Sequence, residues 1–468
     1  MENLNVKELR DTLSATPKNA WEVLSEDDRR DLYAYCDRYL SFISANKTER
    51  ETVRSAVAMA QKAGYTEYSF GMPLRRGEKY YFNNRGKSLF LFDMGTDARS
   101  YDLRIAAAHV DAPRLDLKQN PLYSDSGLAM LKTHYYGGIK KYQWATVPLA
   151  LHGTVIRQDG SSVDVVLGED PSEPVFYISD LLPHLGKDQM QKTLADGITA
   201  EQLNLICGSR PIEGTDEKEG DTVALRFLSL LHEKYGITER DLLTAELCAV
   251  PAGNARFVGL DRSLLAGYGH DDRICAYTAL TGLLRTDSSS SPRMVILADK
   301  EEIGSVGNTG MRSAVLDDLL TAIASACGVT SAQLRANALC LSADVAAAFD
   351  PTFANVYDKR NSAYAGNGLA VCKFTGARGK SGASDASAET AARVRDLFDR
   401  NDVVWQMCEM GKVDQSGGGT VAAYLADLNI DVLDVGVALL SMHAPCELAS
   451  AADLYMAHRG FSAFFAGK

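Results

Sequence analysis

Apolar residues recur at helical spacing near the start of the chain. Ser25, which precedes three acidic residues, is a candidate N-cap for a helix. The apolar positions that follow it repeat with the period of a helix, at Leu32, Tyr35, Cys36, Tyr39, Leu40 and Ile43. Thr48 and Glu51 match a capping box, and Gly64 is a candidate stop. The pattern predicts two helices, which begin after Ser25 and after Thr48.

Compact apolar runs then replace the helical pattern. Residues 88–95 (SLFLFDMG) and 102–111 (DLRIAAAHVD) are typical of buried strands. From residue 254, strand-like runs such as 293–299 (RMVILAD) and 338–344 (ALCLSAD) alternate with helical patterns such as 272–285 and 311–328. This alternation predicts an α/β fold, in which helices cover both faces of a largely parallel sheet as a three-layer α/β/α domain.

The middle of the chain has a different texture. Residues 154–168 (TVIRQDGSSVDVVLG) predict two strands around a turn, and 223–236 predict a helix. These patterns favour a smaller, separate unit that interrupts the α/β domain. We therefore expect a first part of the α/β domain at 1–111, an insertion at 112–253 and a second part at 254–468.

Composition and charge narrow the possible partners. The chain is 46% hydrophobic and 24% charged, as in ordinary globular proteins, and its formal net charge is −12. This acidic balance argues against nucleic acid or an anionic membrane as the main partner. The N-terminus lacks the apolar core of a signal peptide, and the nine cysteines include no C-x-x-C pair. We therefore expect a cytoplasmic protein with reduced cysteines.

Histidines and carboxylates gather where predicted strands end or helices begin. They are His109, Asp111, Asp271, Asp272, Glu301, Glu302, Asp344 and His443. Each alone has an ordinary explanation as a structural histidine, a turn or an N-cap. Together they form the nitrogen and oxygen ligand set of zinc, manganese or cobalt at the carboxyl ends of strands. They are enough for two metals about 3.5–4 Å apart that share a carboxylate.

Two spacings suggest roles beyond metal binding. In a strand, Asp111 would face the same way as His109 and could accept a hydrogen bond from its ring. Glu301 and Glu302, as neighbours on an extended loop, would point apart, so that one binds metal and the other acts as a general base toward a metal-activated water. Motifs for a serine nucleophile, a P-loop or a dinucleotide-binding turn are absent from the sequence.

Five segments, in order and spacing, resemble the aspartyl aminopeptidase family, which includes vacuolar aminopeptidase I. The segments are 107–118 (AAHVDAPRLDLK), 267–280 (GYGHDDRICAYTAL), 297–307 (LADKEEIGSVG), 341–351 (LSADVAAAFDP) and 439–450 (LLSMHAPCELAS). The resemblance covers nearly the whole chain. It implies a di-metal aminopeptidase that uses two divalent ions, with zinc first and cobalt or manganese as alternatives, and that hydrolyses the N-terminal residue of peptides.

The resemblance also implies a role for each site residue. His109 and Asp344 would hold one metal, Glu302 and His443 the other, and Asp271 would bridge them. It implies further that Glu301 is the general base and that Asp111 orients His109.

In this family the middle region corresponds to an inserted dimerisation domain, and the subunits assemble from dimers into a tetrahedral dodecamer. His184 is the candidate for a histidine contributed to a neighbouring subunit's site. Lys373 matches a position implicated in binding an acidic substrate side chain, and a surface lysine is the alternative. Residues 134–153 and 373–389 depart from typical members and resemble a bacterial branch of undefined specificity, which leaves the preference for acidic N-terminal residues open.

Two other functions remain open from the sequence. The same ligands could serve a related di-metal amidohydrolase or carboxypeptidase that acts on N-acyl or C-terminal amides. A shell-forming or binding protein with a vestigial site is the third reading. A requirement for a free α-amine separates the first two functions, and metal content separates both from the third.

Overall fold

The computed structural model describes residues 6–15, 17–97, 99–213, 221–415 and 417–467. Two long N-terminal helices begin where the sequence predicts them. Helix α3 (Glu26–Ala45) follows Ser25 and buries all six predicted apolar positions, and α4 (Glu49–Lys62) follows the Thr48 capping box. Two shorter helices, α1 (Val6–Leu13) and α2 (Ala20–Val23), precede them.

A nine-stranded sheet forms the centre of the larger part of the molecule, in the order β1-β2-β3-β13-β4-β14-β20-β16-β18. Its strands are β1 (Thr66–Glu67), β2 (Lys79–Asn84), β3 (Ser88–Asp93), β13 (Arg293–Ala298), β4 (Arg104–His109), β14 (Leu339–Ala343), β20 (Asp431–Gly436), β16 (Leu369–Cys372) and β18 (Trp405–Met407). The four central strands β13, β4, β14 and β20 are parallel, whereas β2, β3 and β13 pair antiparallel, as do β20 and β16. The sheet is therefore mixed, and the expectation of a largely parallel sheet holds for its centre.

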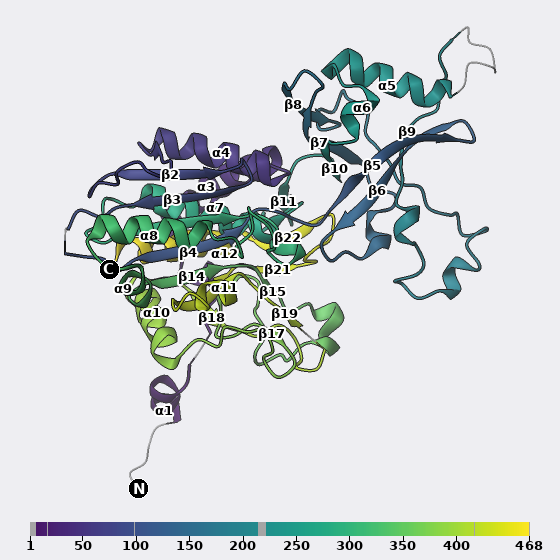
Figure 1. The fold of residues 1–468 in the computed structure, drawn as a ribbon. Helices are drawn as coiled ribbons and strands as arrows, with labels where there is room; N and C mark the ends of the chain where they lie inside the picture. Colours follow the sequence, from purple (N-terminus) through teal and green to yellow (C-terminus); the bar gives the residue numbers. More distant parts are fainter. Residues whose placement is uncertain (1–5, 16, 98, 214–220, 416, 468) are drawn as a thin grey trace.

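Helices cover both faces of this sheet (Figure 1). One face packs against α3, α4, α7 (His270–Arg285), α10 (Ala388–Arg400) and α12 (Ala451–Ala466). The other packs against α8 (Val315–Cys327), α9 (Ser331–Ala336) and α11 (Ala422–Ala426). Along β4, Ala106 and Ala108 face the first helix layer, while Ile105 and Ala107 face the second. Burial on both faces explains why this strand is apolar throughout.

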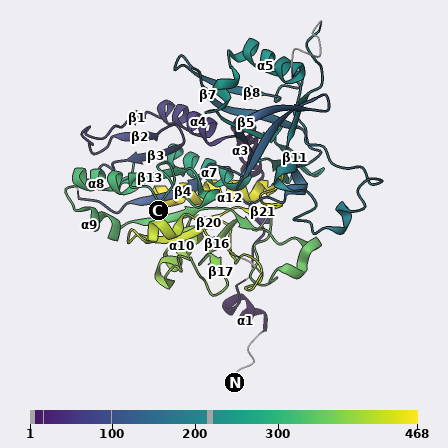
Figure 2. The ribbon, with the colours of Figure 1, turned by 45° about the vertical axis from the view of Figure 1, so that its right-hand side comes forward.

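A second, six-stranded sheet stands beside the first (Figure 1). Its order is β8-β7-β10-β5-β6-β9, and every pairing is antiparallel. The strands are β5 (Arg114–Asp125), β6 (Leu128–Tyr136), β7 (Leu149–Ile156), β8 (Ser162–Leu167), β9 (Leu205–Gly208) and β10 (Glu246–Pro251). Helices α5 (Thr222–Tyr235) and α6 (Glu239–Leu242) belong to the same part of the chain. Figure 2 shows α5 on the side away from the nine-stranded sheet.

Two small sheets complete the fold. One contains β11 (Arg256–Val258), β12 (Leu264–Gly267), β22 (Glu447–Ser450), β21 (Ala438–Leu440) and β15 (Ala346–Ala347). The other pairs β17 (Gly376–Ala377) with β19 (Gly417–Gly418). Among the described helices, none is both long enough and apolar enough to cross a membrane.

Candidate metal centre

Neighbouring parallel strands deliver the candidate ligands to one place. His109 is the last residue of β4, Asp344 follows β14, and Glu301 and Glu302 follow β13, which lies on the other side of β4. Asp271 begins α7. The carboxyl ends of parallel strands meet at one edge of a sheet, which is where ligands of α/β proteins gather.

Asp271 faces two groups of ligands at once. Its Oδ1 lies 3.2 Å from His109 Nε2, and its Oδ2 lies 3.1 Å from Nε2 of His443, which lies between β21 and β22. His109, Asp271 and Asp344 form one group of converging ligand atoms, and Asp271, Glu302 and His443 form the other. One carboxylate thus belongs to both groups, with a different oxygen turned to each histidine.

Burial makes this concentration of carboxylates costly without a counter-charge. Burial and the nearby Asp271 raise the pKa of Glu302 well above its usual range, and burial and Asp272 do the same to the pKa of Asp344. For Asp271 burial opposes ionisation, but hydrogen bonds from His109 and His443 outweigh it and lower the pKa. The Oε1 atom of Glu302 is buried and has no hydrogen-bond partner among the described residues. Divalent cations would neutralise these charges and occupy the orphaned oxygen, so the residues fit two such ions.

Asp111 organises the loop that carries the two glutamates. It is fully buried; its Oδ1 accepts a hydrogen bond from the amide of Glu301 at 3.1 Å, and its Oδ2 accepts one from the amide of Glu302 at 3.2 Å. His109 Nδ1 lies 3.0 Å from the main-chain oxygen of Asp111 and 3.3 Å from its Oδ1. Asp111 lies beyond the end of β4, so its proximity to His109 comes from the segment that connects β4 to β5 rather than from strand alternation.

The backbone that carries Glu301 and Glu302 differs from the one expected. They lie on a 3₁₀ turn (Glu301–Ile303) that follows Lys300 in the left-handed region, not on an extended loop. Glu302 joins the second ligand group, whereas the Glu301 carboxylate accepts no hydrogen bond from the described residues and its Oε2 lies 3.9 Å from His109 Nε2. Burial raises the pKa of Glu301.

The ligands open into a cavity of about 950 Å³ that also contains apolar and cationic side chains. Phe374, Met410 and Met442 line it, as do Arg378 and Lys380. Lys373 lies outside this cavity and lines a smaller one with Trp405 and Arg395. His184 is exposed in the segment that connects β8 to β9, and it does not line the metal cavity of its own chain.

One buried carboxylate that holds two ligands in place was not among the residues predicted from the sequence. Glu447 Oε2 accepts a hydrogen bond from the amide of Asp271 at 3.0 Å, and its Oε1 accepts one from the amide of His443 at 2.7 Å. The signal available in the sequence was a glutamate four residues after the candidate ligand His443. Asp272, which was also among the candidate ligands, accepts the amide of His109 at 3.2 Å.

Comparisons with known proteins identify the family of this chain. The family model for aminopeptidase I zinc metalloproteases (M18) matches residues 42–465. The probable M18 family aminopeptidase 1 of Clostridium acetobutylicum is 48% identical over 96% of this chain and 97% of its own length. Among solved structures, the crystal structure of aminopeptidase I from C. acetobutylicum matches with a TM-score of 0.90 and 44% sequence identity. The match covers 97% of this chain and 100% of the chain in that structure.

A second solved structure leads to the same family. The M18 aminopeptidase of Thermotoga maritima also has a TM-score of 0.90, at 40% identity, and covers 97% of this chain and 99% of its own. The chain therefore belongs to the M18 family of zinc metalloprotease aminopeptidases.

Proposed function

We propose that this M18 aminopeptidase removes the N-terminal residue of peptides with two metal ions, a water nucleophile and Glu301 as general base. The proposal is supported by two neighbouring carboxylates. One belongs to both ligand groups, and the other accepts no hydrogen bond from the described residues. Asp271 faces both ligand groups, and the Glu301 carboxylate stays uncommitted beside them.

Each residue then has a distinct task. His109 and Asp344 would hold one ion, Glu302 and His443 the other, and Asp271 would bridge the two. When bound, the ions polarise the scissile carbonyl and make water more acidic. Glu301 receives the proton of the attacking water and returns it to the leaving amine. Asp111 accepts the amides of Glu301 and Glu302 and so holds the turn that carries both residues.

Replacement of the base tests this assignment. In Glu301→Gln, turnover should fall by about 10²–10⁴-fold, because the amide cannot accept the proton. Metal content should remain at about two ions per chain, as measured by elemental analysis. Glu389→Gln, an exposed glutamate at the start of α10, is the control and should cleave normally. Normal turnover by Glu301→Gln would contradict the role of Glu301.

We also propose a preference for acidic N-terminal residues, with zinc as the native ion and cobalt or manganese as substitutes. Support for the preference comes from Arg378 and Lys380, which line the same cavity as the ligands; Lys373 lines a different one. Lys380 already contacts Asp385 at 3.1 Å, so Arg378 is the freer cation. A panel of acidic, basic and apolar aminoacyl nitroanilides, assayed with each metal, should favour acidic residues, and Arg378→Gln should reduce that preference.

We further propose that residues 1–111 and 254–468 form a three-layer α/β/α catalytic domain and that 112–253 form a dimerisation domain, with dimers assembling into a dodecamer. Every strand of the six-stranded sheet falls within the inserted range. Large exposed apolar side chains gather in the segment that also carries His184, at Leu181, Leu182, Leu185, Met190 and Leu194. A more distant structure, the mApe1 of S. cerevisiae, 21% identical, is a dodecamer. His184 would then reach a neighbouring subunit's site.

A further inference from the structure

One short segment of the inserted sheet contacts two residues of the second ligand group, Glu302 and His443, and also Asp111, which accepts the amides of the catalytic turn. The segment is Tyr136–Gly138, at the end of β6. We propose that it sets the geometry of the metal centre, so that the inserted domain is a positioning element for catalysis as well as an assembly element. The inference rests on the proposed di-metal function and adds Tyr136 and Gly137 as positioning residues.

The first contact is a hydrogen bond to Asp111. The Tyr136 hydroxyl donates to Asp111 Oδ2 at 2.8 Å, the same oxygen that accepts the amide of Glu302. Asp111 is fully buried, so its carboxylate relies on these donors to stay fixed. Loss of the Tyr136 donor would leave the carboxylate short of one partner and free to turn. Because Asp111 holds the turn at Glu301 and Glu302, the turn would then lose its fixed position.

The second contact fixes a histidine ligand. His443 Nδ1 lies 2.7 Å from the carbonyl oxygen of Gly138 and donates its ring proton there. Because Nδ1 donates to the carbonyl, Nε2, which is directed at Asp271, is the nitrogen that would give up its proton to bind a metal. A main-chain carbonyl makes this contact, so its position depends on the path of the segment.

Gly137 allows the segment to lie this close. Its φ is +74°, in the left-handed region that favours glycine. A Cβ at this position would meet Glu302 Oε2 at 3.1 Å and Glu302 Cβ at 3.3 Å. A side chain at Gly137 would therefore push against Glu302, which belongs to the second ligand group, and against the path that leads to Gly138.

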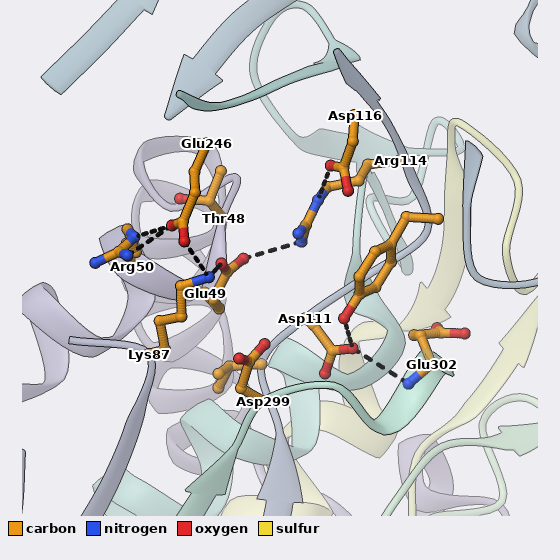
Figure 3. Close-up of polar contacts among 12 residues, drawn as sticks. Thr48, Glu49, Arg50, Lys87, Asp111, Arg114, Asp116, Glu246, Asp299 and Glu302 are labelled. Carbon is orange, nitrogen blue, oxygen red and sulfur yellow. Dashed lines mark hydrogen bonds and ion pairs between the residues drawn. The ribbon is translucent and has the colours of Figure 1, made fainter. Parts of the chain in front are cut away.

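The ion pairs of Arg114 with Glu49 and Asp116 (Figure 3) hold the guanidinium that packs on the Tyr136 ring. The guanidinium of Arg114 lies 4.1 Å from the centre of the Tyr136 ring and donates to Glu49 at 2.9 Å and to Asp116 at 2.7 Å. Arg114 and Asp116 lie on β5 of the six-stranded sheet, and Glu49 begins α4, which packs on the nine-stranded sheet. Tyr136 therefore links the arrangement of the two sheets to the ligands.

Removal of a single hydroxyl tests the first contact. Tyr136→Phe keeps the ring over Arg114 but cannot donate to Asp111. We expect metal affinity, measured by chelator competition, to fall by about 10-fold or more, as for other partners of metal-site residues. We expect kcat to fall with little change in KM, because the defect lies in the catalytic turn. Tyr135→Phe, at an exposed neighbour on the same strand, is the control and should match the wild type.

A glycine pair tests the second contact. Gly137→Ala and Gly160→Ala both place a side chain at positive φ (+74° and +82°), but a Cβ at Gly160 would meet no atom of the described residues within 4 Å. Both variants should lose some thermal stability, and only Gly137→Ala should bind metal more weakly. This comparison separates backbone strain from an effect on the ligands.

The outcomes of these two tests are distinct. If the wild type binds two metals and both Tyr136→Phe and Gly137→Ala bind them equally tightly, the positioning role is wrong while the proposed function stands. If the wild type binds no metal, the proposed function itself fails. A lowered melting temperature without a change in metal affinity would show that the segment is merely structural and would also overturn the inference.

Discussion

At the scale of single residues, the metal centre depends on two carboxylates that belong to neither ligand group and instead accept hydrogen bonds from main-chain amides. Asp111 holds the amides of Glu301 and Glu302, and Glu447 holds the amides of Asp271 and His443. Asp111 therefore fixes one proposed ligand, Glu302, and the proposed base, Glu301. Glu447 fixes two proposed ligands. Mutations of such supporting groups reduce metal affinity even though they touch no ion.

Glu447→Gln is the sharpest test of this support. The substituted amide keeps one acceptor oxygen, so either Asp271 or His443 loses its main-chain partner. We expect metal affinity to fall by about 10–100-fold while the fold is retained. Chelator competition measures the affinity, and circular dichroism checks the fold. Glu233→Gln, at an exposed position on α5, is the control. Unchanged affinity in Glu447→Gln would show that Glu447 does not support the ligands.

Sequence could predict residues that act through local pattern but not those that act through tertiary contact. The ligands follow apolar strands, and parallel strands bring their ends together, so His109, Asp344 and Glu302 were visible as a group. Tyr136 and Glu447 act on residues 25 and 176 positions away, and nothing in their local sequence shows those partners. The 3₁₀ turn at Glu301 was missed because it depends on Asp111 accepting its amides.

At the scale of elements, capping explains why the N-terminal helices begin where they do. Ser25 accepts the amide of Asp28 at 3.1 Å, and Asp28 accepts the amide of Ser25 at 3.1 Å. Because Ser25 is exposed, its replacement affects the cap and little else. Ser25→Ala should therefore lower the free energy of unfolding by about 1 kcal/mol, as measured by urea denaturation. The account of this cap would be wrong if Ser25→Ala and the wild type unfolded at the same urea concentration.

A buried histidine joins α4 to the inserted sheet and should make stability depend on pH. His152, on β7, lies 2.8 Å from Glu51 and 2.9 Å from Glu169, and Lys47 lies 3.7 Å from Glu169. Burial opposes protonation of His152, but hydrogen bonds to the two carboxylates outweigh it and raise its pKa. The pKa of Glu51 is lowered, so it stays ionised at neutral pH.

The sign of the pH effect follows from the raised histidine pKa. The stabilisation by His152 should be fully present below its unfolded pKa of about 6.5 and should be lost as the pH rises through the folded value. His152→Gln should remove this part of the pH dependence. Urea denaturation of both proteins between pH 5.5 and 9 measures the difference, which should shrink as the pH rises. A difference that stays constant across this range would contradict a charged His152.

At the scale of the whole molecule, the inserted sheet has two proposed tasks. It carries the exposed apolar segment near His184, and it carries Tyr136–Gly138 against the metal centre. Assembly and catalysis would then share one structural unit. Contacts between subunits would stabilise the same sheet that fixes the ligands.

Mass measurement in solution tests the assembly. The wild type should form a dodecamer, and charged substitutions at Leu185 and Leu194, which are 70% and 73% exposed, should produce smaller species. Burial of these side chains between subunits would stabilise the assembly, and a charge would oppose that burial. A wild-type monomer, or a dodecamer unaffected by both substitutions, would contradict the proposed interface.

The most direct test of the central claim is the substrate's need for a free amine. The zinc-loaded protein should hydrolyse aminoacyl nitroanilides and leave their N-acetylated counterparts intact, and treatment with a chelator should abolish the hydrolysis until zinc is restored. This is the result expected of a two-metal aminopeptidase. Cleavage of the N-acetylated substrates at a comparable rate would contradict it and would favour a di-metal amidohydrolase.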